Sequence, residues 1–335
     1  MRKMLSPFTC ICFALGFILC LQPVNAGAAE ETPLVLYTSV TATTPQVPLW
    51  AAIKNGWPQG RKLDVRPWKN FDDLRGVLLA GKGDIWLGNL EGFAQAAQRG
   101  APVTLLAVTG WKKFHFLTTD ATIDDLDSLA RTLAQKKMTL AVAPADSPAI
   151  AVLQEIGKRG GPSFAINTFA SQQLALDLLR GGIAHALLPE PLVSTLLAKK
   201  PELRRIASLE DEFAVRLGGP ARLPMIGIAV NSRLIDQNPA LIRSLALAMQ
   251  EQAARLSDNP QAALDVLPNE VRAQASEDIL LASLAHDLIL ALPAWEVRPE
   301  LEAFLRMVAP QAERNLPPHF IMEPHRVALP AGIPE

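Results

Sequence analysis

Cysteine is scarce in this sequence, and every cysteine lies close to the N-terminus. The three cysteines are Cys10, Cys12 and Cys20. All three fall inside a segment that we predict to be removed on export, so the exported chain would contain no thiol. This excludes a disulfide framework, a thiolate metal site and a cysteine nucleophile in that chain.

The sequence also lacks an excess of charge of either sign. Lys and Arg number 32, Asp and Glu number 33, and the formal net charge is -1. Proteins that bind nucleic acid usually present a basic face, so we expect no nucleic-acid partner. The 335 residues have room for two domains, and the hydrophobic share of 49% can form a large core.

Familiar catalytic and metal-binding motifs are missing as well. There is no GxSxG, HExxH or phosphate-binding loop signature. The five histidines are scattered along the chain, and none forms an i, i+4 pair; they are His115, His185, His286, His319 and His325. His319 with Glu323 and His325 is the nearest approach to a ligand set, and a solvated tail explains it more simply. We therefore predict no metal and no cofactor.

The N-terminus has the pattern of a secretory leader. Arg2 and Lys3 precede an apolar run over residues 11–21, and small residues follow around Ala26 and Ala28. The run is short for a membrane span, which needs about 20 residues. We predict a signal peptide over residues 1–26, cleaved near Ala26 or Ala28, and a periplasmic location. The alternative is an uncleaved N-terminal anchor.

Apolar strand candidates alternate with helical segments from residue 34 to residue 230. Short polar or glycine-containing links separate them, which predicts a parallel sheet covered by helices. A helix-rich region follows, punctuated by Pro239, Pro260, Pro293 and Pro310.

One pattern occurs twice, one hundred positions apart. In residues 78–91 and again in residues 178–191, a helix end is followed by a glycine, an apolar strand and a polar loop. Two such units predict two lobes of similar build, although chance similarity between two helix-strand joints is the alternative.

Several segments together resemble the periplasmic substrate-binding proteins of ABC importers. The resemblance is to the nitrate, sulfonate and taurine type and to the thiamine-pyrimidine-precursor type. It rests on residues 43–56, 79–85, 100–103, 179–191 and 223–231. Ala184 departs from the aspartate usual in the family, and residues 317–335 match nothing in it.

The resemblance implies a two-lobed periplasmic-binding-protein (type II) fold of the α/β class. Residues 33–118 and 222–335 would form the first lobe, residues 119–221 the second, and residues 115–119 and 224–230 would cross between them. A monomer would then bind a small polar organic molecule between its lobes and deliver it to a membrane permease. Sulfonates, amines and nitrogen heterocycles are the ligand classes considered.

Candidate ligand-binding residues follow the predicted strands, where loops on a rigid scaffold often carry function. They are Thr41, Thr43, Thr44, Asn89, Glu91, Trp111, Asp146, Ser147 and Glu190. Helix capping is the simpler role for the threonines and for Asp146. Trp111 is a candidate aromatic wall. Glu190 is the strongest single candidate, because Pro189 and Pro191 restrict the backbone around it.

If Glu91, Asp146 and Glu190 all approach the cleft, it would be acidic. It would then disfavour a bare anion such as nitrate. A ligand with amino or ring N–H donors would fit better.

An enzyme of the same fold is the main alternative function. A pyridoxal-dependent pyrimidine-precursor synthase would use a lysine, and a porphyrin-precursor deaminase would need a cysteine. The predicted leader argues against both, and the lack of further cysteines argues against the second. A ligand-sensing lobe of a receptor is a third possibility, but the chain contains no receptor segment. We predict a binding protein and not an enzyme.

Overall fold

The computed structural model describes residues 32–41 and 43–327. The description below concerns the compact unit Pro33–Glu335. The predicted leader and the last eight residues of the proline-rich tail lie outside the described residues.

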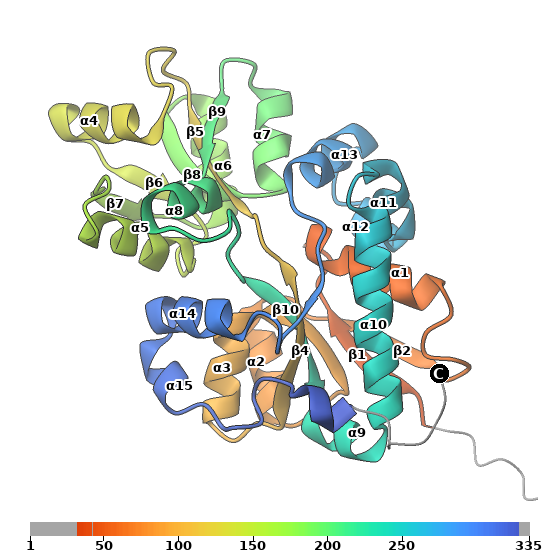
Figure 1. The fold of residues 1–335 in the computed structure, drawn as a ribbon. Coiled ribbons are helices and arrows are strands. Elements are labelled where there is room, and N and C mark those ends of the chain that lie inside the picture. The colour runs from red at the N-terminus through yellow and green to blue at the C-terminus, as the bar shows by residue number, and fades with distance from the viewer. Residues whose placement is uncertain (1–31, 42, 328–335) are drawn as a thin grey trace, which may run out of the picture. The chain divides into compact units, whose positions relative to one another are not determined.

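A mixed six-stranded sheet contains the first strands of the unit and two later ones (Figure 1). Its order is β11-β4-β10-β3-β1-β2. The strands are β1 (Leu34–Thr38), β2 (Leu63–Pro67), β3 (Ile85–Asn89), β4 (Val103–Gly110), β10 (Ile226–Asn231) and β11 (Leu292–Pro293). Strand β1 is parallel to β2 and β3, whereas β10 runs antiparallel between β3 and β4.

A second mixed sheet repeats this arrangement with five strands in the order β7-β6-β8-β5-β9. They are β5 (Phe114–Thr118), β6 (Leu140–Val142), β7 (Ile166–Thr168), β8 (His185–Pro189) and β9 (Arg204–Ser208). Strand β6 is parallel to β7 and β8, and β5 is antiparallel to β8 and β9. The two sheets confirm the predicted α/β class, and their antiparallel strands β5 and β10 correct the expectation of a parallel sheet.

The predicted crossover at residues 115–119 is wrong by a few positions. Strand β5 pairs with β8 along its whole length, from Phe114 to Thr118. These residues belong to the second sheet, and the chain passes between the sheets at residues 111–113. The return passage, between α8 and β10, contains Gly218 and Gly219, whose φ angles are +82° and +94°.

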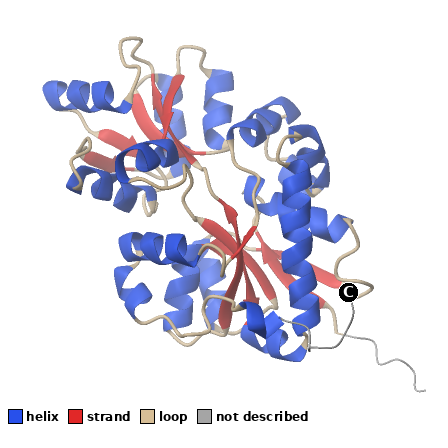
Figure 2. Ribbon diagram, viewed as in Figure 1, coloured by secondary structure: helices blue, strands red, loops and turns tan. Residues whose placement is uncertain are grey.

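Helices flank both sheets (Figure 2). Those between the strands of the first sheet are η1 (Thr44–Gln46), α1 (Val47–Lys54), α2 (Phe71–Leu79) and α3 (Leu90–Gln98). Those between the strands of the second are α4 (Leu126–Lys136), α5 (Ala149–Lys158), α6 (Ser171–Arg180) and α7 (Leu192–Lys199), and α8 (Leu209–Leu217) follows its last strand in the sequence, β9.

The region after β10 is mainly helical, as its proline punctuation predicts. Its helices are α9 (Ser232–Gln237), α10 (Pro239–Leu256), α11 (Pro260–Val266), α12 (Asn269–Arg272), α13 (Glu277–His286), α14 (Arg298–Val308), α15 (Pro310–Arg314) and η2 (Pro324–Val327). Pro239, Pro260 and Pro310 each occupy the first helical position, where proline loses no hydrogen bond.

Alternation along β3 shows how the first sheet is buried on both faces. Ile85 and Leu87 join a core with α1, α10 and α11, while Trp86 joins the core with α2 and α3. The core that contains Trp86 continues through Trp111 and Phe116 into the second sheet. Side chains therefore pack without a break through the passage between the sheets.

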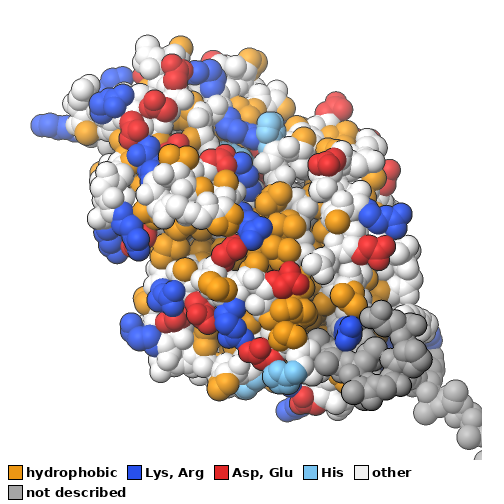
Figure 3. Space-filling model, in the orientation of Figure 1, with side chains coloured by type: hydrophobic (Ala, Val, Ile, Leu, Met, Phe, Trp, Pro, Cys, Tyr) orange, Lys and Arg blue, Asp and Glu red, His pale blue; other side chains and the backbone are white. Residues whose placement is uncertain are grey.

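Helices of the C-terminal region also reach the second sheet's helices. Helix α13 contacts α7, and α14 contacts α5. On the face shown in Figure 3, hydrophobic side chains gather near the middle and charged ones lie mostly around them. Within residues 32–327, leaving out residue 42, no helix combines the length and apolarity needed to cross a bilayer.

Gly227 in β10 offers a test of the packing at the centre of the first sheet. A Cβ at Gly227 would lie 2.6 Å from the Ala107 carbonyl oxygen on β4, which is backbone and cannot rotate away. We expect Gly227→Ala to lower the free energy of unfolding by about 1–3 kcal/mol.

Gly76 in the exposed part of α2 is the matched control. Its Cβ would meet nothing within 4 Å, so Gly76→Ala should raise the free energy of unfolding by about 0.5–1 kcal/mol. Urea denaturation of both variants measures these changes, and equal effects would contradict the packing described.

Candidate functional site

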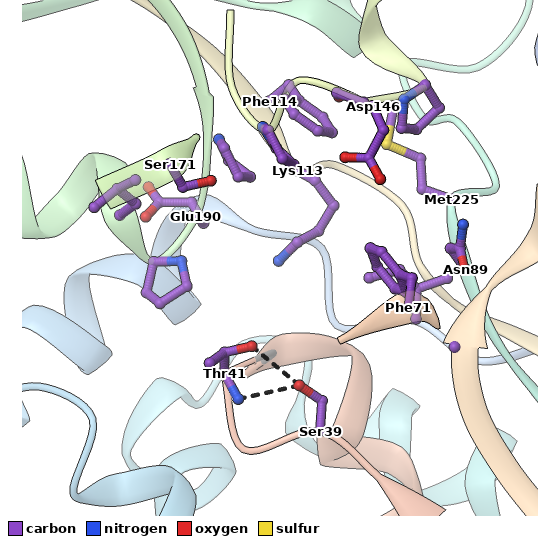
Figure 4. Close-up of a pocket in the computed structure, with 18 of the residues that line it drawn as sticks. Ser39, Thr41, Phe71, Asn89, Lys113, Phe114, Asp146, Ser171, Glu190 and Met225 are labelled. Atoms are coloured by element: carbon purple, nitrogen blue, oxygen red, sulfur yellow. Dashed lines mark hydrogen bonds between the residues drawn. The ribbon is translucent and has the colours of Figure 1, made fainter. Parts of the chain in front are cut away.

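A cleft of about 970 Å³ lies between the two sheets. Residues from both sides line it (Figure 4). From the first sheet and its helices come residues that include Ser39, Thr41, Phe71, Asn89, Glu91 and Met225, and from the second come residues that include Pro144, Asp146, Ser147, Ser171 and Glu190.

Strand direction explains why polar loops meet here. Strands β1, β3, β6 and β8 end at Thr38, Asn89, Val142 and Pro189, and the lining residues follow directly after these ends. In open α/β sheets, loops at the carboxyl ends of the strands form the ligand crevice.

Six of the nine predicted site residues line the cleft. They are Thr41, Asn89, Glu91, Asp146, Ser147 and Glu190. Asp146 does not cap α5, because the N-cap position of that helix is Pro148. Its side chain extends into the cavity instead (Figure 4).

Trp111 does not line the cleft, so the predicted aromatic wall at this position is wrong. Its ring is fully buried, and its Nε1 donates a hydrogen bond to the Leu290 carbonyl oxygen at 2.9 Å. The Arg222 guanidinium lies 4.9 Å from the ring centroid. Trp111 is part of the core at the passage between the sheets.

Thr43 and Thr44 are also absent from the lining. Both are fully buried, and neither hydroxyl has a hydrogen-bond partner among the described residues. Thr43 is the N-cap of η1, but its side chain makes no capping bond. Ser39, which the sequence interpretation missed, lines the cleft beside Thr41. Its Oγ lies 3.0 Å from Thr41 Oγ1 and accepts from the Thr41 backbone N–H at 3.1 Å (Figure 4).

The Glu190 carboxylate lies at the wall of the cleft with its oxygens engaged by the protein. One oxygen accepts from Arg205 at 2.6 Å and from Ser194 Oγ at 3.0 Å, and the other accepts from the Ser194 backbone N–H at 3.1 Å. The peptide bond between Glu190 and Pro191 is cis. The charge of Glu190 is balanced by Arg205.

Lys113 is a lining residue that the sequence interpretation did not select. It lies on the passage between the sheets and points into the cleft (Figure 4). Its ammonium forms an ion pair with Asp287, and the Asp287 side chain is fully buried. The two residues are 174 positions apart, so sequence spacing gives no signal of the pair.

The sequence interpretation also did not identify the apolar residues of the lining. It includes Trp68, Phe71, Leu87, Phe114 and Met225. The rings of Trp68 and Phe71 lie 5.3 Å apart, and Trp68 Nε1 donates to the Leu87 carbonyl oxygen at 3.0 Å. These contacts fix an aromatic surface on the side of the first sheet.

Glu210 holds the passage between the sheets from behind the cleft. Its Oε1 accepts from the backbone N–H groups of Lys113 and Phe114 at 2.8 and 3.3 Å. Complete burial raises the pKa of this carboxyl from 4.5 to about 8. Next to it, burial and then the charges of Arg205 and Lys113 lower the pKa of His115 to about 2, which keeps the ring neutral.

Glu91 and Asp146 approach the cleft from opposite sheets. Glu91 lies in the first turn of α3 and accepts a hydrogen bond from Gln95 Nε2 at 2.9 Å. Burial, and secondly the charge of Asp146, raise the pKa of Glu91. Within the described residues, no group of three or more His, Cys, Asp or Glu side chains is arranged to hold a metal ion.

Solved structures with the same arrangement come from transport proteins. An ABC transporter protein from Parabacteroides distasonis aligns with a TM-score of 0.70 at 16% identity, over 88% of this chain and 100% of the other. The aliphatic sulphonate binding protein SsuA of Escherichia coli aligns with a TM-score of 0.62 at 12% identity, over 90% and 94%.

The nitrate-binding protein NrtA of Synechocystis PCC 6803 aligns with a TM-score of 0.58 at 13% identity, over 85% of this chain and 84% of the other. The chain has the two-lobed fold of the periplasmic binding proteins. The fold predicted from the sequence resemblance is therefore confirmed. No protein-family model matches the chain, and a search of curated proteins finds no match.

The contribution of Glu210 to the stability of the protein can be tested through its dependence on pH. Its pKa is higher in the folded than in the unfolded chain. The stability of the native protein relative to a Glu210→Gln variant should therefore fall as the pH rises from about 4.5 to about 8, by roughly 1.4 kcal/mol per pH unit, and then level off.

Urea denaturation at pH 5.5, 7 and 9 measures this difference. Glu251→Gln, at an exposed position on α10, is the control, and its difference from the native protein should vary by less than about 0.5 kcal/mol. A flat difference for Glu210→Gln over the same range would show that the carboxyl is already ionised in the folded protein.

Proposed function

We propose that this protein is the solute-binding component of an ABC-type importer. It would bind a small polar organic molecule in the cleft and deliver it to a membrane permease. The observation that carries the proposal is the cleft at the carboxyl ends of strands from both sheets, lined from both sides by polar loops and apolar side chains. Such concave, mainly apolar sites with a few polar groups are typical of small-molecule binding.

The neighbouring structures support the role and a range of ligand classes. Two of them are described as binding aliphatic sulphonates and nitrate. For this chain we propose an organic ligand of the sulfonate, amine or nitrogen-heterocycle class. The proposed place of action is the periplasm, after removal of residues 1–26 near Ala26 or Ala28, and the proposed working form is a monomer.

Domain closure would complete the site. We propose that the strands of the first sheet with the C-terminal helices form one lobe, and residues 114–217 the other. The chain joins them through residues 111–113 and 218–225. Two short links between packed lobes permit hinge closure around a ligand, so each lobe would supply half of the contacts.

Binding without chemistry accounts for the lining residues better than the pyridoxal-dependent alternative does. An enzyme of that type forms an imine with a lysine amine. Lys113 is the buried lysine of the cleft, and Asp287 engages its ammonium. Lys199 lies exposed at the end of α7, where solvent competes with any imine.

A ligand screen on the chain without residues 1–26 tests the carrier function. A ligand at a concentration of 100 times its dissociation constant should stabilise the folded protein by about 2.7 kcal/mol. It should also reduce the radius of gyration measured by X-ray scattering, because the lobes close.

The screen should contain sulfonates, amines, aromatic nitrogen heterocycles and inorganic anions. Native mass spectrometry should recover the bound molecule chemically unchanged. Turnover of the bound molecule, or an imine absorbance from Lys113 or Lys199, would favour the enzyme instead.

A further inference from the structure

Most charges that line the cleft are already paired within the protein. Three ion pairs cover the majority of them: Arg75 with Asp72 at 2.6 Å, Arg205 with Glu190 at 2.6 Å, and Lys113 with Asp287. The last two pairs are buried, so solvent screens them little. An incoming ligand that engaged Lys113 or Glu190 would have to compete with an existing partner.

Two carboxylates of the lining are left without a cation. Glu91 and Asp146 form no ion pair within the part of the chain that the structure describes, and Gln95 is the hydrogen-bond partner of Glu91. The remaining lining charge, on Lys199, is exposed at the end of α7. The unpaired acidic groups of the lining therefore outnumber its unpaired basic group, although the formal net charge of the whole chain is only -1.

The two carboxylates come from opposite lobes. Glu91 stands at the start of α3, and Asp146 stands in the loop between β6 and α5. Closure would bring these like charges closer and would remove water from both, and each effect is unfavourable. A cation held between them would reverse this cost, so closure would depend on a positively charged ligand.

The apolar side chains of the lining indicate the chemistry of the rest of such a ligand. Trp68 and Phe71 form an aromatic surface on the first lobe, and Phe71 is 39% exposed. Leu176 on α6, across the cleft, is 45% exposed. Large apolar side chains exposed at a binding cleft are typical of sites that take up an apolar ligand body.

We propose that the cleft selects an organic cation: an ammonium or similar group between Glu91 and Asp146, joined to an aromatic or aliphatic body against Trp68 and Phe71. This inference rests on the proposed solute-binding function and narrows its ligand class. A bare inorganic cation fits less well, because no group of three acidic or histidine ligands surrounds the site within the described residues.

Three probes that share one body and differ in head group test the proposal. They are 2-phenylethylammonium, 2-phenylethanol and 2-phenylethanesulfonate, measured by isothermal titration calorimetry with the chain lacking residues 1–26. The ammonium should bind at least about tenfold more tightly than the alcohol, and the sulfonate more weakly still.

Charge-removing variants assign the effect to the two carboxylates. Glu91→Gln and Asp146→Asn should each weaken ammonium binding about five- to tenfold and leave alcohol binding within about twofold. Glu251→Gln, which removes an exposed carboxylate on α10 that does not line the cleft, is the matched control and should change ammonium binding less than about twofold. Thermal melts confirm that each variant is folded.

Several outcomes would overturn the proposal. They are tighter binding of the sulfonate or alcohol, equal losses in Glu251→Gln and Glu91→Gln, and no binding of any probe at millimolar concentration. Tight binding of the sulfonate with closure of the lobes would be consistent with the carrier function and would refute only the proposed selectivity for a cation. The carrier function itself fails if no class in the wider screen binds and closes the lobes.

Discussion

The passage from the first sheet to the second depends on one buried carboxyl group. Glu210 accepts the backbone N–H groups of Lys113 and Phe114, which are the residues where the chain leaves one sheet and enters the other. Unsatisfied buried N–H groups are costly, so the first residue of β5 is placed by this contact. The same contact positions part of the cleft lining, because the Lys113 side chain points into the cleft and Phe114 lines its wall.

Buried ion pairs add further contacts around the same part of the cleft. The Lys113 ammonium is tied to Asp287 at the end of α13, and α13 itself contacts α7 of the second lobe. Across the cleft, Arg205 on β9 fixes Glu190 at the end of β8. Removing one member of such a buried pair leaves an uncompensated charge. The protein therefore uses most of its cleft charges for structure, and few of them face a ligand unpaired.

The sequence predicted the architecture well because the architecture depends on local patterns. Alternating strands and helices, the glycines at Gly81 and Gly181, and prolines at helix starts are all readable from neighbouring residues. The carboxyl ends of the strands also point correctly to Thr41, Asn89, Glu91 and Asp146 as lining residues.

The incorrect predictions concern residues whose positions or partners depend on contacts with distant parts of the chain. Trp111 follows a strand like the other candidates, but Leu290 and Arg222, each more than a hundred positions away, draw it into the core. Glu190 lines the cleft, but its carboxylate forms an ion pair with Arg205 on a later strand. The crossover was placed too late, because nothing local distinguishes the last residues before β5 from β5 itself.

The two links between the lobes are built differently, and this has a mechanical consequence. The outgoing link is held by Glu210, whereas the return link contains Gly218 and Gly219 in a backbone region that other residues rarely adopt. A Cβ at either glycine would touch nothing within 4 Å. In the proposed closure of the lobes, the outgoing link would act as the fixed hinge point, and the return link would take up the change in backbone angles. Substitutions at Gly218 or Gly219 would then shift the balance between the proposed open and closed forms and leave every lining residue of the cleft unchanged.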